Sequence, residues 1–575
     1  MLIINSIPAL FLANPLSLEE YQMLSDSASL TSFSWNGVLD NYSGGYPLSA
    51  IIYAPFLFAI SDSIILYKTI IVLNAAILSL IAPISFFCAK LLDIKNNYTA
   101  FFIALAVGIN PILITKSSLV SGDIAGIISI WLILLFLLKA KIAKTKLKII
   151  LYSFLLGSTA SIQGGSFYLP FIYALILIVL FIYFKLLNKK CIFSIWAFLI
   201  GFAVFTITQV FVELFILTIF NKTNLNIFDY NIFNSWFDMI KPQHFYFSGI
   251  FSRLFYIISA SFGFAAIAIT AAIVAIYKYL KKSENQKKSE NIFILSFFLL
   301  IGLIGTIASA QADLISISEL SRITDSFIPF IIFFGLIYLF NFNFNSKKII
   351  LSIFISIYLI SAFYLIVYPI ININDFYPQI NHGINLFLNK NNNLFTLDSY
   401  SILKIISIIL TIFIIILAAS FCGKKNKSKY FASGFILLFI ISSAFSANIY
   451  FSSANEIFNE EIASVKNVSS SVFNENGAPK ISLYGLTDKQ SAYLQFKNRK
   501  VKFYNYQSLS EIPSETLVVM SKYEPTTELL NGRVFKIGEA DDIFIYAYGE
   551  QAINYAISKN IIEEWELSES DDALA

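Results

Sequence analysis

The sequence predicts a polytopic α-helical membrane protein, with about thirteen transmembrane helices, that carries a small α/β domain at its C-terminal end. Three observations predict this fold class. Hydrophobic residues make up 57% of the 575 residues and charged residues only 13%, whereas soluble domains are about one quarter charged. Hydrophobic runs of spanning length recur between short lysine-rich breaks. Beyond residue 449 charged residues become frequent. A soluble cytosolic enzyme and a disordered chain are both excluded.

Thirteen hydrophobic segments have the length and composition of candidate spans. They lie near residues 3–14, 63–89, 98–115, 124–140, 148–162, 167–185, 192–218, 252–278, 292–310, 326–340, 348–369, 401–420 and 430–448. The first is shorter than the ~20 residues that a span needs. It has neither a positive N-terminal region nor a small-residue cleavage site, so a signal peptide is not expected. We expect either an unusually short helix or a chain that begins late relative to its relatives.

Lysine placement predicts the orientation, because cytoplasmic loops carry an excess of positive charge. Six breaks hold 21 lysines and alternate with breaks that hold almost none. The lysine-rich breaks are 90–95, 139–148, 185–190, 278–288, 347–348 and 424–429. We therefore expect a multi-pass protein of the cell membrane with these breaks in the cytoplasm. The extracytoplasmic parts are then 15–62, the loops near 116–123, 219–251, 311–325 and 370–400, and the tail from 449.

Two domains follow from this division. Residues 1–448 are expected to form the transmembrane domain, which includes the extracytoplasmic loop 15–62. Residues 449–575 are expected to form an extracytoplasmic α/β domain with an acidic tail, because short alternating runs and helical stretches succeed one another there. The strands are predicted at Ile481–Tyr484, Val501–Tyr506, Thr516–Met520, Val534–Ile537 and Ile543–Tyr548, and the helices at Asp488–Phe496 and Gln551–Ile562.

Acidic residues on the extracytoplasmic side are the first candidates for chemistry. Glu19 and Glu20 stand in the first external segment, and Asp123 stands at the mouth of a span. An ionisable group at a span boundary is costly unless it has a role or a partner. The simpler interpretations are a solvated loop pair for Glu19 and Glu20, and a helix N-cap for Asp123. The residues alone leave these alternatives evenly balanced.

Arginine usage is a second indication. The chain has four arginines, and the two in its transmembrane domain, Arg253 and Arg322, lie on the extracytoplasmic side. Lysine would suffice for topology, whereas the planar guanidinium binds phosphate with two parallel hydrogen bonds. The simpler interpretation for Arg322 is a helix-surface pair with Asp325. Phosphate binding is the interpretation that we favour.

The remaining signals are weak. The chain has no nucleotide-binding or metalloprotease motif, and no nucleic-acid partner is expected. Its three cysteines and two histidines form no disulfide or metal-type spacing, although carboxylates could hold a divalent ion. His244, in an external loop rich in Phe and Tyr, is a minor candidate for substrate binding.

The order of these features resembles that of the GT-C superfamily of integral membrane glycosyltransferases, which includes protein mannosyltransferases and aminoarabinose transferases. The features are an acidic pair before Tyr21, Tyr46-Pro47 before an apolar stretch, Asn74 in a span, Asn110-Pro111 before a Ser-rich loop, Asp123, and Arg322 in an Arg-x-x-Asp-x-x-x-Pro setting. The resemblance covers roughly residues 15–340. The family's usual pair is Asp-Glu, so Glu19 is a departure, as is Gln163 where an arginine is common.

The resemblance implies a polyprenyl-phosphate or polyprenyl-diphosphate sugar as donor and an active site that opens outside the cytoplasm. It implies that Glu19 or Glu20 is the catalytic base, that Asp123 is the acidic residue of the second loop, and that Arg322 contacts the lipid-linked phosphate. Arg253 and Tyr46 are further substrate-binding candidates. The acceptor would be a cell-surface glycan, a lipid or a protein, and no cofactor is certain.

The chemistry is also consistent without a family name. A glycosyl phosphate carries its own leaving group, so the reaction needs a carboxylate to take the acceptor proton and positive charge on the departing phosphate. Two alternatives stay open. A lipid or glycolipid transporter would need ionisable groups near mid-membrane, where Lys68 and Glu213 are the closest. A non-catalytic assembly subunit would use its C-terminal domain to bind a partner.

Overall fold

The structure is a computed structural model of the whole chain, and it divides into two compact units. It describes most of residues 1–39, 47–161, 257–280, 327–341, 479–522 and 534–559, with Asp325 and shorter pieces at 200–211, 295–303 and 462–473. Unit 1 comprises Met1–Phe11, Ile71–Ser118 and Gly122–Ser452. Unit 2 comprises Leu12–Ile70, Leu119–Ser121 and Ser453–Ala575. The predicted spans near 167–185, 348–369, 401–420 and 430–448 lie outside the described residues.

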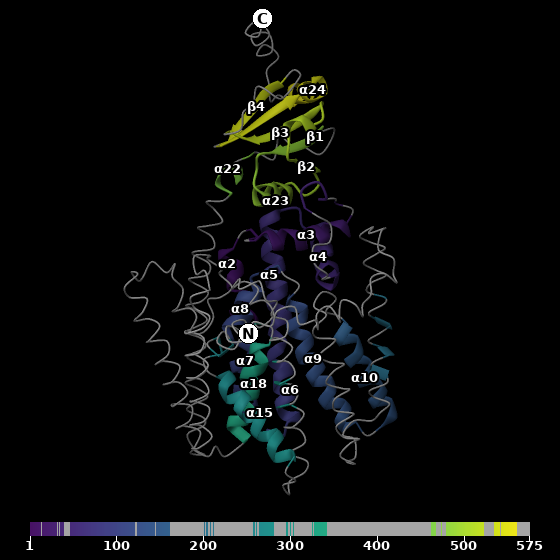
Figure 1. The fold of residues 1–575 in the computed structure, drawn as a ribbon, viewed down its shortest axis with the longest axis vertical. Helices are drawn as coiled ribbons and strands as arrows, with labels where there is room; N and C mark the ends of the chain where they lie inside the picture. Colours follow the sequence, from purple (N-terminus) through teal and green to yellow (C-terminus); the bar gives the residue numbers. More distant parts are fainter. Residues whose placement is uncertain are drawn as a thin grey trace, which may run out of the picture. The chain divides into compact units, whose positions relative to one another are not determined.

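Unit 1 is a bundle of apolar helices (Figure 1). Its described helices are α1 (Leu2–Ser6), α2 (Pro8–Phe11), the second half of α5 (Ser63–Ser79), α6 (Ile81–Leu91), α7 (Asn97–Gly108), α8 (Pro111–Ser117), α9 (Asp123–Ile142), α10 (Lys146–Ser161), α15 (Phe264–Leu280) and α18 (Ile328–Asn341). Within the described ranges, two helical stretches are long and apolar enough to cross a membrane, Ser63–Leu91 and Ile124–Ile142. Their positions agree with two of the predicted spans.

The predicted span at 98–115 is two helices rather than one. α7 ends at Gly108 and α8 begins at Pro111. Asn110 caps α8, since its side-chain oxygen accepts a hydrogen bond from the backbone N–H of Ile112 at 2.9 Å. Proline fits the first turn of a helix but disfavours helical backbone in the residue before it. The Asn-Pro pair therefore ends one helix and starts the next. The first predicted span, 3–14, is likewise replaced by the short helices α1 and α2.

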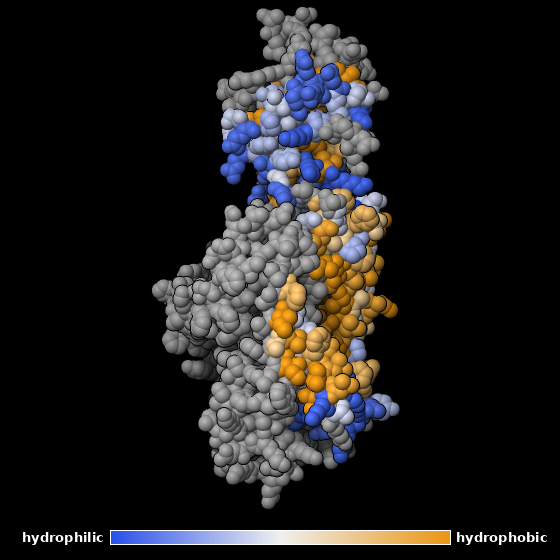
Figure 2. All heavy atoms as spheres, turned by 90° about the vertical axis from the view of Figure 1, so that its right-hand side faces the viewer, coloured by the Kyte–Doolittle hydropathy of each residue, from blue (hydrophilic) through white to orange (hydrophobic). Residues whose placement is uncertain are grey.

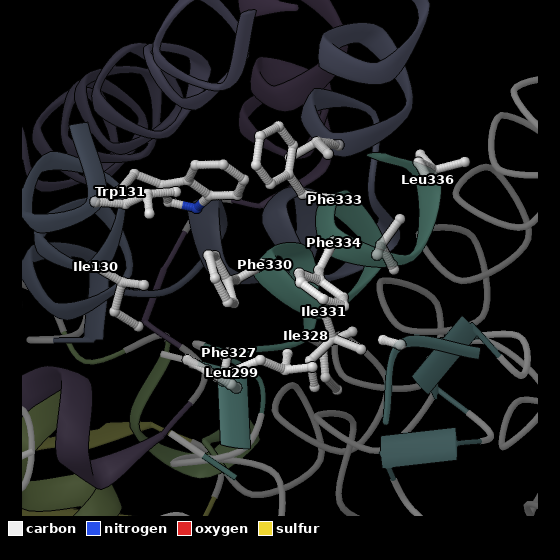
Figure 3. Packing of buried hydrophobic residues seen from close by; sticks show 14 of the residues in the cluster. Ile130, Trp131, Leu299, Phe327, Ile328, Phe330, Ile331, Phe333, Phe334 and Leu336 are labelled. Atoms are coloured by element: carbon white, nitrogen blue, oxygen red, sulfur yellow. The ribbon is translucent and has the colours of Figure 1, made fainter. Parts of the chain in front are cut away.

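The core of unit 1 is packed around an aromatic group (Figure 3). The indole of Trp131 on α9 meets the rings of Phe330 and Phe333 on α18 edge to face, at centroid separations of 6.0 and 5.1 Å. All three side chains are buried. Such edge-to-face pairs add stabilisation beyond the area that they bury. In a helix bundle surrounded by lipid this close packing, rather than exclusion of water, holds the helices together.

The described helices of unit 1 expose many large apolar side chains. They include Phe87, Phe101, Leu151, Phe154 and Ile273. Figure 2 shows a broad hydrophobic face that ends in a hydrophilic border. Exposed apolar area of this extent is rare on soluble monomers. It suits a surface that faces lipid.

We expect Trp131→Ala to lower the stability of the protein much more than Trp131→Phe. Alanine leaves a cavity among the rings, which costs about 3–5 kcal/mol in well-packed cores. Phenylalanine keeps a ring in place, and the indole N–H finds no hydrogen-bond partner among the described residues. The melting temperature of the purified protein in detergent measures both effects. Equal losses in the two variants would contradict this account of the packing.

Unit 2 combines two parts of the sequence that are far apart. The first part holds α3 (Leu18–Ser29), α4 (Pro47–Ala59) and the first half of α5. The second part is the C-terminal α/β domain, which holds α22 (Ala463–Lys466), β1 (Lys480–Tyr484), α23 (Asp488–Lys497), β2 (Phe503–Tyr506), a 3₁₀ turn η4 (Leu509–Glu511), β3 (Thr516–Ser521), β4 (Val534–Ala540), β5 (Ile543–Tyr548) and α24 (Glu550–Ser558). The five predicted strands and two predicted helices of this domain are present, with bounds that differ by a few residues, and the predicted end of the last helix, Ile562, lies outside the described residues.

The five strands form one mixed sheet in the order β2-β1-β3-β5-β4. β1 pairs in parallel with β2 and β3, whereas β5 pairs antiparallel with β3 and β4. The parallel β1–β2 pair needs a crossover, which α23 supplies. Thr487 starts α23 through a reciprocal capping box with Gln490. This arrangement leaves β2 as an edge strand of the sheet.

Candidate functional site

Glu19 and Glu20 lie in the first turn of α3, not in a loop. The segment Ser17-Leu18-Glu19-Glu20 has the pattern of a helix start, with a small hydroxyl residue three positions before a glutamate. The Ser17 side chain accepts a hydrogen bond from the backbone N–H of Glu20. Negative charge in a first turn is favoured by the helix dipole. The local sequence therefore explains why the helix begins here.

The structure distinguishes the two glutamates. Glu19 is exposed, whereas Glu20 is only 2% exposed. The Glu20 Oε2 accepts hydrogen bonds from the Tyr67 hydroxyl and from the backbone N–H of Val120, both at 2.9 Å. Its Oε1 lies 3.5 Å from the Ser17 Oγ. Donors aimed at an ionised carboxylate form bonds about twice as strong as neutral ones. The interpretation of the pair as a solvated loop is therefore wrong for Glu20.

Tyr21 lies beside this carboxylate and is fully buried. Burial raises the pKa of Tyr21 well above its usual value, and the negative charge of Glu20 raises it further. The Tyr21 hydroxyl has no hydrogen-bond partner among the residues that the structure describes. Tyr21 therefore stays neutral, and its ring packs against the C-terminal domain.

Asp123 is the first residue of α9. It lies inside the helix rather than at the N-cap that the simpler interpretation expects, although an acidic residue in the first turn is still favoured by the helix dipole. Val120, which binds Glu20, precedes Asp123 by three residues.

Unit 1 contains a buried ion pair that the sequence did not reveal. The Lys116 Nζ lies 3.7 Å from an Asp325 carboxylate oxygen, and the two side chains are 2% and 0% exposed. Asp325 is therefore not on a helix surface, which corrects the interpretation of Arg322 and Asp325 as a surface pair. One sequence signal could have found Lys116: it is a lysine at a break of the lysine-poor side.

Other polar side chains gather at the same helix, α8. The Ser117 Oγ donates to the backbone carbonyl of Asn5 at 2.7 Å. The Asn5 side-chain amide donates to the Ser79 hydroxyl at 3.1 Å. Asn5 and Ser117 are both fully buried. Buried polar groups in a helix bundle surrounded by lipid need such partners, so these bonds tie α1, α5 and α8 together.

Four predicted substrate-binding residues lie outside the described residues: Tyr46, His244, Arg253 and Arg322. Within the described part of the chain, no group of three or more His, Cys, Asp or Glu side chains could hold a metal ion. The structure thus brings Glu20 together with Tyr67 and Val120, and Lys116 together with Asp325.

The described helices and the α/β domain have a fold that is already known from solved structures, so the resemblance predicted from the sequence is confirmed at the level of fold. Two solved structures share this fold: ArnT from Cupriavidus metallidurans bound to undecaprenyl phosphate, and the same protein in the apo state. Their TM-scores are 0.51 and 0.52, and each alignment covers 95% of this chain and 96% of ArnT. The identity of 12% establishes similarity of fold alone. No protein-family model and no curated protein matches the chain.

Proposed function

We propose that the chain is a membrane glycosyltransferase that moves a sugar from a polyprenyl-phosphate donor to an acceptor outside the cytoplasm. Two facts support the proposal. The fold is that of ArnT, which has been solved with undecaprenyl phosphate bound. The chain also holds a buried carboxylate, Glu20, that accepts hydrogen bonds from two donors on one oxygen and lies in the segment that the sequence predicts to be external. The Glu20 carboxylate is the observation that carries the proposal.

In the reaction that we propose, Glu20 accepts the proton of the acceptor hydroxyl as that oxygen attacks the anomeric carbon. The bond from this carbon to the phosphate oxygen breaks, and polyprenyl phosphate leaves with the electron pair. A general base must lie within hydrogen-bond reach of the proton that it takes. The bonds from Tyr67 and Val120 hold one carboxylate oxygen still, which keeps the group oriented toward the acceptor.

The departing phosphate needs positive charge, because charge develops on its oxygens in the transition state. Arg322 and Arg253 are the residues that we propose for this role, since a guanidinium binds two phosphate oxygens at once. Asp123, Tyr46 and His244 stay candidates for contacts with the sugar or the acceptor. The proposed acceptor is a cell-surface glycan, a lipid or a protein, and a divalent ion could be held by carboxylates. One assay can test both the acceptor class and the need for an ion.

A transfer assay on the purified full chain tests the function. The probes are radiolabelled undecaprenyl-phosphate sugars in detergent micelles, with a crude cell-envelope extract as acceptor source. We expect the label to move to the extract and undecaprenyl phosphate to be released in equal amount. Parallel reactions with EDTA show whether a divalent ion is required. In sealed vesicles, movement of labelled lipid across the membrane without release of undecaprenyl phosphate would instead support a transporter.

A further inference from the structure

The C-terminal domain and the first external segment are joined by a dense set of contacts within unit 2. Phe496, near the end of α23, lies between two aromatic residues of the first external segment. Its ring meets Tyr21 at 5.8 Å and Trp35 at 6.5 Å, edge to face in both cases. All three side chains are buried. Tyr21 is the residue after Glu20 on α3. The contact with Phe496 therefore packs α23 against the helix that carries the candidate base.

Arg499 makes a second connection, to the end of α4. Its guanidinium donates hydrogen bonds to the backbone carbonyls of Leu57, Ile60 and Ser61. The last carbonyls of a helix have no partner within the helix and carry partial negative charge. Arg499 is 7% exposed, and this burial lowers its pKa while the nearby Asp62 opposes the shift. A planar fork can serve several carbonyls at once, which a lysine ammonium does less well.

Two further hydrogen bonds involve backbone carbonyls of the same short segment, residues 496–499. The Trp35 indole N–H donates to the carbonyl of Arg499 at 3.0 Å. The Ser63 hydroxyl donates to the carbonyl of Phe496, also at 3.0 Å. Ser63 begins α5, and Tyr67 follows it by one helical turn on the same face. The segment 496–499 therefore anchors both α3, which carries Glu20, and the start of α5, which carries the Tyr67 donor.

The edge strand β2, which follows the segment 496–499, also contacts the first external segment. The backbone N–H of Asn505 on β2 donates to the carbonyl of Gly37 at 2.8 Å. A side chain at Gly37 would collide with the Phe503 carbonyl oxygen and the Tyr504 ring. The first external segment thus covers an edge that would otherwise expose unpaired backbone groups.

We propose that the segment Phe496–Arg499 sets the position of the Glu20 carboxylate relative to Tyr67 and Val120, so that the C-terminal domain is a working part of the catalytic unit. Phe496 and Arg499 are positioning residues, since they reach Glu20 through α3, α4 and α5. This inference rests on the proposed function, in which Glu20 is the base. If the C-terminal domain only bound the acceptor, the packing of α23 against α3 would not affect the position of the Glu20 carboxylate.

The first test compares Phe496→Leu and Arg499→Lys with wild type in the transfer assay. A misplacement of about 1 Å at a reacting group can cost about 100-fold in rate, so we expect kcat to fall between about 10- and 100-fold with the KM for the lipid-linked donor unchanged. Phe544→Leu is the matched control, because Phe544 lies on β5 and makes no contact with the segment 496–499 among the described interactions. It should keep wild-type kcat. An unchanged kcat in both test variants, or a rise confined to the KM for the acceptor, would overturn the proposal.

The second test needs no transfer activity and so separates this inference from the proposed function. Hydrogen–deuterium exchange is measured on the full chain in detergent, for peptides that cover residues 18–29 and 116–122. We expect faster exchange there in Phe496→Leu, because the Val120 N–H loses its fixed acceptor on Glu20. Peptides from β1, β3 and β5 should exchange as in wild type. Unchanged exchange at both peptides would contradict the proposal even if the enzyme is active, and faster exchange in an inactive protein would reject only the function.

Discussion

Replacing Glu20 with glutamine is expected to slow sugar transfer by about 10²- to 10⁴-fold, the usual contribution of a general base. Glutamine has the same shape as glutamate, and its carbonyl oxygen can still accept from Tyr67 and Val120. The fold should therefore survive while the proton acceptor is lost. The initial rate of label transfer from the undecaprenyl-phosphate sugar, at saturating donor, measures the effect.

Glu19→Gln is the matched control for this experiment. It removes the same charge from the neighbouring residue, which is exposed rather than buried, and it should leave the rate near that of wild type. Glu20→Ala is a useful third variant. It leaves the Tyr67 hydroxyl and the Val120 N–H without their acceptor, which costs about 1–3 kcal/mol per buried group. Full activity of Glu20→Gln, or a comparable loss in Glu19→Gln, would remove Glu20 from the role of base.

Lys116→Met is expected to destabilise the protein by about 3–5 kcal/mol, the usual cost of removing one partner of a buried ion pair. The reason is that the buried Asp325 carboxylate loses the positive charge of Lys116, which lies 3.7 Å away. The double variant Lys116→Met/Asp325→Leu should recover most of this loss, since a well-packed apolar pair of similar size is often neutral or stabilising. Thermal unfolding of the single and double variants in the same detergent measures the difference.

These variants form a double-mutant cycle, which measures the interaction free energy between Lys116 and Asp325. If the pair is a unit, each single variant is less stable than the double variant. If the losses of the two single variants simply add in the double variant, Lys116 and Asp325 act independently and the ion pair does not hold unit 1 together. Asp325→Leu is the second single variant that the cycle needs.

The local elements of this protein were accessible from the sequence. The five strands of the C-terminal domain and helix α23 lie where the alternating runs and the helical stretch of the sequence predict them. The long apolar helical stretches that begin at Ser63 and Ile124 also lie where two spans are predicted, since apolar runs of this length are a signal that the sequence carries directly. The break at Asn110-Pro111 is also a local signal, because it depends on the chemistry of two adjacent residues.

The choice between Glu19 and Glu20 was not accessible in this way. Both residues occupy the first turn of one helix, and no local rule says which faces the interior. Tyr67 and Val120 decide it, from 47 and 100 residues away along the chain. Lys116 and Asp325 meet across a still longer separation, so neither residue reveals the other in the sequence. The residues missed or left open are all defined by contacts between distant segments.

The sequence by itself predicted a membrane protein of many helices with an α/β domain at its end, and it predicted candidate catalytic carboxylates in the first external segment. Only the tertiary structure decided which carboxylate is buried, and that the C-terminal domain packs onto the same segment through Phe496, Trp35 and Arg499. The physical reason is the distance along the chain over which each interaction acts. Hydrophobic periodicity and helix caps act over a few residues, whereas a buried charge is stabilised by whichever distant donors the fold brings to it.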